Sequence, residues 1–141
     1  MGDVFVGSLM SSPVHTISGD ATLREAAAVL LEHGIGSVIV VDDDGGLDGI
    51  LTATDFVGIV AGERHGDAPS TTVAEAMSTD VVTATANEAI ETAADLMVES
   101  GHNHLPIIDA ENVVIGVLAA HDLTAYISTV RAPSPPRRED A

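Results

Sequence analysis

Two short segments of the sequence carry side chains that could bind a polar ligand at the start of a helix. The first segment, residues 49–55, is an apolar run that ends in Thr52-Ala53-Thr54-Asp55. A helix N-terminus offers unpaired N–H groups and a partial positive charge, so it suits a phosphate, and a hydroxyl there adds a further donor. A carboxylate one turn further along could accept both hydroxyls of a ribose. The same Thr-x-x-acid spacing is also that of a capping box, which would serve only the helix.

The second segment repeats the first one 67 positions later. It reads Gly-Val-Leu-Ala-Ala-His-Asp, so Asp122 corresponds to Asp55, while Ala119 replaces Thr52. The similarity extends from residues 10–56 to residues 77–123, with 13 identities in 47 positions and no gap. Similarity at a fixed offset indicates two copies of one supersecondary unit.

Two other patterns could carry chemistry, but neither completes a metal site. His102 and His104 flank Asn103 and could chelate a metal, yet the local sequence places no third ligand. We rank two alternatives above a metal site. The first is a structural or solvent-facing role for these histidines, and the second is contact of His104 or Asn103 with a phosphate. The run Asp42-Asp43-Asp44 lacks the twelve-residue spacing of a calcium loop and favours a solvated hairpin turn.

The sequence also lacks the motifs of the common enzyme classes. It contains no G-x-S-x-G, no H-E-x-x-H and no P-loop, and nothing organises its Ser, His and Asp residues into a triad. We therefore predict that the protein is not an enzyme and has neither a catalytic residue nor a metal site.

The elements that must position these residues follow the order β-α-β-β-α in each copy. In the first copy we predict a strand at 14–17, a helix that ends at Gly34, a hairpin formed by 37–41 and 47–51, and a helix at 52–61. The second copy repeats this order with a strand at 81–83, a helix before Gly101, a hairpin formed by 105–108 and 113–118, and a helix at 120–130. Each first helix carries an apolar stripe that we expect to be core: Leu23, Ala26, Ala27, Leu30 and Leu31 in one copy, and Ile90, Ala93, Ala94, Met97 and Val98 in the other.

These elements predict a mixed α/β (α+β) fold. Each unit is too small to bury its own sheet face, so we expect the two to pack about a pseudo-twofold axis. The first unit, with an N-terminal lead-in, covers residues 1–61; a polar linker covers 62–72, and the second unit covers 73–130. The Pro-rich tail at 131–141 is expected to be disordered.

Charge and composition exclude several kinds of partner. The 141 residues include 22 acidic side chains, five arginines and no lysine, which gives a formal net charge of −17. A field of this sign repels nucleic acids and anionic membranes. The lack of cysteine and of a secretory signal favours the cytoplasm. Such a charge is tolerated best in concentrated salt, where the Debye length falls to about 3 Å at 1 M, so we interpret it as a halophilic adaptation.

In combination, the motifs resemble those of the CBS domain, and the chain from about Val6 to Tyr126 resembles a tandem CBS pair, often called a Bateman module. The motifs that carry this resemblance are Met10-x-x-x-Val14-x-Thr16, Gly49-Ile50-Leu51-Thr52-x-x-Asp55, Met77-x-x-x-Val81-x-Thr83, His104-Leu105-Pro106-Ile107-Ile108-Asp109 and Gly116-Val117-Leu118-x-x-x-Asp122. The resemblance implies a stand-alone, non-catalytic regulatory module that binds an adenosyl ligand such as AMP, ADP, ATP or S-adenosylmethionine, without another cofactor. It also implies a homodimer and a regulated protein that the sequence does not name.

The resemblance further implies that each of two clefts takes residues from both copies. The cleft that we name the Asp55 cleft would be lined by Thr52, Thr54, Asp55, Thr83, His102, Asn103, His104, Leu105 and Pro106. The Asp122 cleft would be lined by Thr16, Ile35, Gly36, Ser37, Val38, His121 and Asp122.

The Asp122 cleft departs from the family pattern, because Ala119 lacks the hydroxyl and Val38-Ile39 replaces Leu-Pro. We therefore expect unequal clefts, with the Asp55 cleft as the occupied one. The first copy has no Lys or Arg near its motif, so a monophosphate, a nucleoside or a sulfonium ligand fits better than a triphosphate. The alternative is an interaction or oligomerisation module that has lost its ligand.

Overall fold

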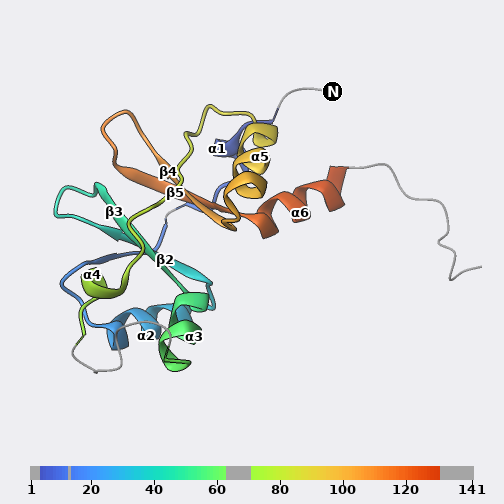
Figure 1. The fold of residues 1–141 in the computed structure, drawn as a ribbon. Coiled ribbons are helices and arrows are strands. Elements are labelled where there is room, and N and C mark those ends of the chain that lie inside the picture. The colour runs from blue at the N-terminus through green and yellow to red at the C-terminus, as the bar shows by residue number, and fades with distance from the viewer. Residues whose placement is uncertain (1–3, 13, 63–70, 131–141) are drawn as a thin grey trace, which may run out of the picture.

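The chain folds into two halves, each with a small sheet and its own helices, in a computed structural model that describes residues 4–12, 14–62 and 71–130 (Figure 1). Most of the predicted linker and the whole predicted tail lie outside these residues. None of the described helices is long and apolar enough to span a lipid bilayer.

Both halves contain the mixture of helices and strands that the sequence predicts. Along the chain, the first copy contains α1 (Val6–Leu9), β1 (Thr16–Ser18), α2 (Leu23–His33), β2 (Ser37–Val41), β3 (Leu47–Thr52) and α3 (Ala53–Val60). The second copy contains α4 (Val73–Ala76), α5 (Ile90–Ser100), β4 (His104–Ile108), β5 (Val114–Ala119) and α6 (Ala120–Val130). The sheets have the strand orders β1-β2-β3 and β4-β5.

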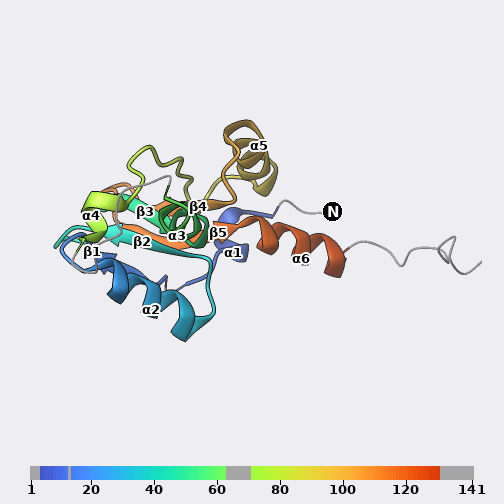
Figure 2. The same ribbon diagram turned by 60° about the horizontal axis from the view of Figure 1, so that its bottom comes forward.

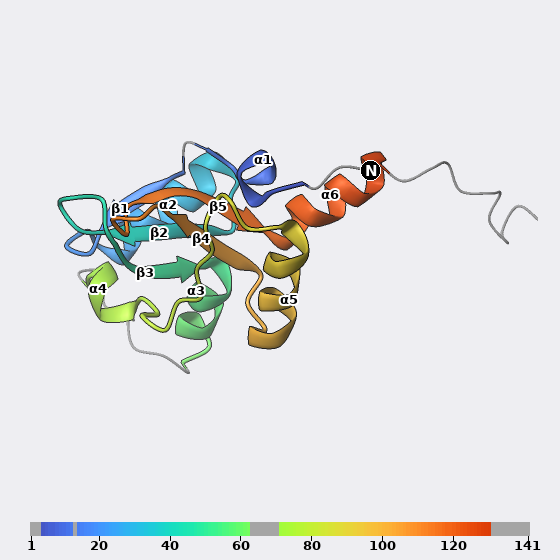
Figure 3. The same ribbon diagram turned by 90° about the horizontal axis from the view of Figure 1, so that it is seen from above.

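The two hairpins lie side by side at the centre of the molecule. Their turns are joined by hydrogen bonds from Leu47 N to the Asn112 carbonyl at 3.2 Å and from Val114 N to the Gly45 carbonyl at 3.1 Å. Helices α2, α3 and α4 lie beside β2–β3, whereas α1, α5 and α6 lie beside β4–β5 (Figures 1 and 3). The corresponding helices α2 and α5 lie on opposite sides of the hairpins (Figure 2).

Helix α2 begins at a capping box and ends at the glycine that the sequence predicts. At its start, the Glu25 carboxylate accepts the Thr22 N–H at 2.8 Å and the Thr22 hydroxyl accepts the Glu25 N–H at 3.1 Å, which completes a capping box. At its end, Gly34 takes the left-handed conformation with φ 61°. Gly101 ends α5 in the same way, with φ 75°.

The predicted apolar stripes are wrong at their last positions. Leu23, Ala26 and Leu30 are buried, but Leu31 is 84% exposed, and its counterpart Val98 in α5 is 82% exposed. Leu31 lies about 100° further round the helix than Leu30, since a turn takes 3.6 residues. Each helix packs on the sheet of one half only, so its buried face is narrower than the stripe.

The predicted strand at 81–83 does not form, although its counterpart in the first half does. Only a single bridge at Ala84 remains of it. In the first half, the Ile39 N–H donates to the His15 carbonyl at 3.3 Å in the parallel pairing. The residue corresponding to Ile39 is Pro106, which has no N–H to donate, so the parallel ladder cannot extend.

The lead-in segments of the two halves are exchanged. Helix α1 belongs to the first copy in sequence, but its Val6 lies in the core of the second half together with Ala84, Ala93, Met97, Leu105, Ile107 and Leu118. Helix α4 belongs to the second copy, but its Val73 and Ala76 lie in the core of the first half together with Leu23, Ala26, Leu30, Val38, Val40, Leu51 and Ile59. Each core is therefore completed by the other copy.

A close contact between a methionine and a glycine follows each exchanged helix. A Cβ atom on Gly49 would lie 2.6 Å from Met77 Sδ and 2.7 Å from the Ser78 carbonyl oxygen. A Cβ atom on Gly116 would lie 2.6 Å from Met10 Sδ. The repeated Met and Gly residues of the two copies thus meet crosswise, because only glycine lets the lead-in of one copy approach the second hairpin strand of the other.

Substitution of Gly49 or Gly116 by Ala should therefore destabilise the whole molecule. We expect each substitution to lower the free energy of unfolding by roughly 1–3 kcal/mol, the cost typical of overpacking. Urea denaturation followed by circular dichroism measures this change. Gly36→Ala is the matched control, because its Cβ would meet nothing closer than His104 Nε2 at 3.4 Å. Equal free energies of unfolding for Gly49→Ala, Gly116→Ala and Gly36→Ala would show that the contact between the Met and Gly residues is not tight.

Candidate functional site

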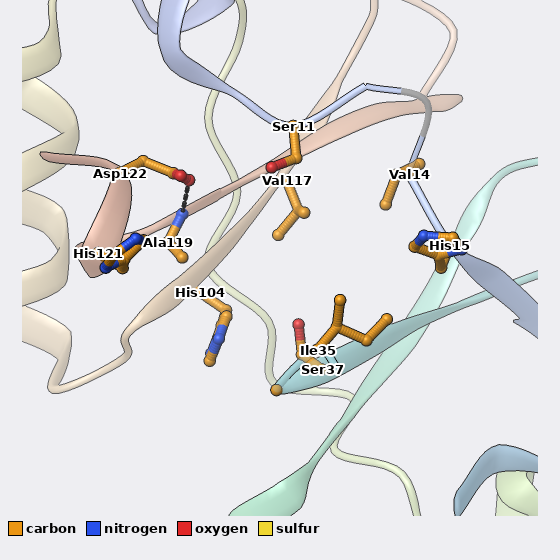
Figure 4. A pocket seen from close by; sticks show the side chains of 11 residues that line it. Ser11, Val14, His15, Ile35, Ser37, His104, Val117, Ala119, His121 and Asp122 are labelled. Atoms are coloured by element: carbon orange, nitrogen blue, oxygen red, sulfur yellow. Dashed lines mark hydrogen bonds between the residues drawn. The ribbon is translucent and has the colours of Figure 1, made fainter. Parts of the chain in front are cut away.

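Two cavities between the halves correspond to the two predicted clefts, and they differ in size. The Asp122 cleft has a volume of about 210 Å³ and is lined by Ser11, Val14, His15, Ile35, Gly36, Ser37, His104, Val117, Ala119, His121 and Asp122 (Figure 4). The Asp55 cleft has a volume of about 50 Å³ and is lined by Ile50, Thr52, Asp80, Val81, Val82, His102, Asn103 and His104.

The size difference follows from side chains at corresponding positions. Residues 35–37 line the larger cavity, and residues 102–104, which lie 67 positions later, line the smaller one. The larger cavity has the small residues Gly36 and Ser37 at two of these positions, whereas the smaller cavity has the bulkier Asn103 and His104. The two clefts are therefore lined from corresponding positions, but their free volumes differ.

Most of the residues predicted for the Asp122 cleft lie in its lining. Ile35, Gly36, Ser37, His121 and Asp122 line the cavity as expected. Two predicted residues are not brought to it: Thr16 is exposed on β1, and Val38 is fully buried in the core of the first half.

Fewer of the residues predicted for the Asp55 cleft line its cavity. Thr52, His102, Asn103 and His104 do so. The others lie outside the lining, where Thr54 is exposed, Asp55 and Thr83 are half-buried, and Leu105 and Pro106 are fully buried. Neither the volumes nor these placements show which cleft takes a ligand, so the preference for the Asp55 cleft that the sequence analysis expects is left untested.

Several lining residues were missed by the sequence analysis. Val14 and His15, and their counterparts Val81 and Val82, directly precede the predicted Thr16 and Thr83. Their position in the chain could have indicated them, because each cleft begins one or two residues before the expected point. Ser11 and Val117 had no local signal, since they meet through a bridge between the exchanged lead-in and β5.

The two acidic residues cap their helices in different ways. The Asp55 carboxylate accepts the Thr52 N–H at 2.8 Å and the Thr52 hydroxyl accepts the Asp55 N–H at 3.1 Å, so the capping box exists. The Asp122 carboxylate accepts the Ala119 N–H at 2.8 Å through Oδ2 (Figure 4). Its Oδ1 accepts no hydrogen bond from the described part of the chain, so this oxygen is available at the edge of the larger cavity.

His104 lines both cavities from the first position of β4. It lies opposite Ala119 in the β4–β5 ladder and is half-buried. Burial lowers the pKa of His104 below its ordinary value of 6.5, and the nearby negative charge of Asp122 partly offsets that shift. The imidazole is therefore neutral at pH 7 and above.

None of the described residues gives either cleft a permanent positive charge. Arg24, the one arginine among the described residues, is exposed on α2 and lines neither cavity. Of the described residues that line the Asp122 cleft, His15, His104 and His121 are the ones whose side chains can become cationic. His15 also stacks on His33, with ring centroids 3.9 Å apart.

The remaining acidic patterns serve the hairpin turns. Asp42 Oδ1 accepts the N–H groups of Asp44 and Gly46 at 2.9 and 2.8 Å, which confirms the predicted solvated turn. Asp109 Oδ1 does the same in the second half with Glu111 and Val113, at 2.8 and 3.0 Å, beside a shallow groove of about 330 Å³. Within the described ranges, no three His, Asp or Glu side chains are grouped so that they could hold a metal ion.

Comparison with known proteins shows a close match over both halves. The model of the CBS domain family matches residues 6–62 and again residues 73–129. The chain is 37% identical over 119 residues to the CBS domain-containing protein YhcV of Bacillus subtilis, which covers 84% of this chain and 81% of that protein.

A solved structure and an enzyme are also similar. The CBS domain pair of protein MJ0100, in complex with 5′-methylthioadenosine and S-adenosyl-L-methionine, superposes with a TM-score of 0.84 at 25% identity, covering 92% of this chain and all of that one. The homoserine O-acetyltransferase of Methanocorpusculum labreanum is 33% identical over 119 residues, which are only 23% of its own length.

The lowered pKa of His104 predicts how stability depends on pH. Between that pKa and 6.5 the unfolded chain binds more protons than the folded one, so this contribution to stability is complete above pH 6.5 and is lost as the pH falls. We expect His104→Gln to lose less stability than the wild type between pH 7.5 and 5.5, as measured by urea denaturation. His102→Gln changes an exposed neighbouring histidine and is the control. Equal pH dependence in His104→Gln and the wild type would contradict the assignment.

Proposed function

Because the chain belongs to the CBS domain family, as a tandem pair of CBS domains, we propose that it is a non-catalytic regulatory module that binds an adenosyl ligand between its halves. The observation that carries this proposal is the Asp122 cleft. It combines a cavity between the halves with a carboxylate at the start of α6 that still has an available oxygen.

The walls of the Asp122 cleft suit the parts of an adenosyl group. Val14, Ile35 and Val117 offer apolar surface for a purine ring, and Asp122 Oδ1 can accept a ribose hydroxyl. The volume of about 210 Å³ is below the roughly 300 Å³ at which ligand pockets begin, so we expect side chains to shift on binding. The Asp55 cleft, at about 50 Å³, requires a larger rearrangement before it can admit the same group.

The charge of the cleft favours ligands without a polyphosphate chain. No Lys or Arg of the described ranges lines it, and the net charge of the chain is −17, so a triphosphate would meet repulsion without a fixed counter-charge from these residues. A thioether, a sulfonium or a monophosphate avoids most of this cost. The 5′-methylthioadenosine and S-adenosyl-L-methionine bound to the similar CBS pair of protein MJ0100 belong to the favoured classes.

Binding between the halves gives a ligand a way to regulate. A ligand that touches both halves favours the relative orientation in which its contacts are best, and it can change the affinity for a protein partner only by that difference. We infer that the regulated partner is another cytoplasmic protein. The acidic surface further supports a protein that works in concentrated salt, where its self-repulsion is screened.

Exposed apolar side chains on the outer helices support a homodimer. Leu31 on α2 and Val60 on α3 are 84% and 88% exposed, and their counterparts Val98 on α5 and Ile127 on α6 are 82% and 52% exposed. The same positions are apolar in both copies, although neither is needed for the core of its own half. We propose that a second copy of the chain covers these helices.

Ligand binding can be tested by thermal unfolding in molar KCl with 5′-methylthioadenosine, S-adenosylmethionine, AMP and ATP. A ligand at 100 times its Kd should stabilise the protein by about 2.7 kcal/mol, and ATP should give the smallest shift. Asp122→Ala should abolish the ligand-dependent shift, while Asp55→Ala should retain it. Loss of the shift in Asp55→Ala instead would assign the ligand to the Asp55 cleft, and no shift with any ligand would favour a ligand-free interaction module.

The dimer can be tested by light scattering coupled to size-exclusion chromatography. The wild type should have twice the chain mass of 14.4 kDa, and the double variant Val60→Glu, Ile127→Glu should have the mass of one chain, because it places charges in the buried interface. Thr79→Glu with Asn87→Glu adds the same charges at exposed loop positions and should remain dimeric. A monomeric wild type would contradict the proposal.

A further inference from the structure

His104 lies between the two clefts and borders both of them. Among the described residues that line the cavities, His104 alone lines both. Its counterpart in the first half is Ser37, which is buried and lines only the Asp122 cleft. The pseudo-twofold arrangement therefore has one bulky side chain between the clefts and not two.

Packing limits where the His104 ring can go. Its Nε2 atom lies 3.4 Å from the point where a Cβ of residue 36 would stand, so the tip of the ring packs against Gly36 of the first half. Ala119 lies opposite it in β5, and Asp122 is close enough to affect its pKa. Figure 4 shows the side chain between Ala119 and Ser37, at the edge of the larger cavity.

Because the His104 ring borders both clefts, a movement of the ring that enlarges one cleft reduces the other. In the arrangement described, the ring leaves about 210 Å³ in the Asp122 cleft and about 50 Å³ in the Asp55 cleft. An adenosyl group is too large for a cavity of 50 Å³, so lining side chains must move to admit it, and His104 is the described lining residue that also borders the Asp122 cleft. A ligand in either cleft therefore opposes a ligand in the other.

We propose that His104 is a wall shared by both clefts, so that the CBS pair binds one adenosyl ligand at a time although it has two clefts of the same construction. This inference rests on the proposed function, because it concerns occupancy of the same sites. In thermodynamic terms, the shared side chain gives the two sites a negative coupling free energy.

The test is the number of ligands bound per chain, measured by isothermal titration calorimetry with 5′-methylthioadenosine at saturation. The wild type should bind one molecule. His104→Ser introduces the residue type of the counterpart Ser37 and so removes the ring that separates the clefts. This variant should bind two molecules. Asn103→Gly copies Gly36 and enlarges only the Asp55 cleft, so it should still bind one. Adding Asp55→Ala to His104→Ser should remove the second binding event and keep the first.

The outcomes separate this inference from the proposed function. Two molecules bound to the wild type would overturn the shared wall while supporting adenosyl binding. One molecule bound to His104→Ser, with circular dichroism showing a folded chain, would also overturn it, as would two bound to Asn103→Gly. Absence of binding to every variant would overturn the proposed function and, with it, the shared wall.

Discussion

The exchange of lead-in helices between the two halves is the constraint on which the rest of the structure depends. Val6 of α1 completes the core of the second half, and Val73 of α4 completes the core of the first. Neither half can bury its apolar surface alone, since each lacks the residues that the other copy supplies. The close approach of Met77 to Gly49, and of Met10 to Gly116, holds these segments against the hairpins. The relative orientation of the halves is therefore part of the core and not an added interface.

The same exchange creates the clefts. After α1, the chain continues along β5 through the bridge between Ser11 and Val117 and then reaches Val14 and His15 at the cavity. A ligand there touches the lead-in of one copy and the helix start of the other, marked by Asp122. Any change in the orientation of the halves must alter this cavity, which is the physical basis of the regulation that we propose.

Symmetry in the backbone coexists with asymmetry in the side chains. The cleft walls come from corresponding residues, but the Asp122 cleft has Gly36 and Ser37 at the positions where the Asp55 cleft has Asn103 and His104. Two clefts of equal construction thus differ about fourfold in free volume, as 210 Å³ compares with 50 Å³. The repeat gives the two clefts the same backbone geometry, and a few differences in their side chains give them different free volumes. Among the residues that the structure describes, neither lining includes a Lys or Arg, which adds an electrostatic preference that applies to either cleft.

Local signals in the sequence were sufficient for the hairpins, the capping box at Thr52 and the Asp residues at the helix starts, because each depends on residues a few positions apart. Similarity at a fixed offset was sufficient for the repeat. The tertiary structure alone decided that Leu31 and Val98 are exposed, and that Pro106 prevents a strand at 81–83. It also decided the exchange of α1 and α4 and the position of His104 between the clefts. The exchange and the position of His104 depend on side chains that lie far apart in the chain and meet only when the halves pack, so neither hydrophobic periodicity nor motif spacing could predict them.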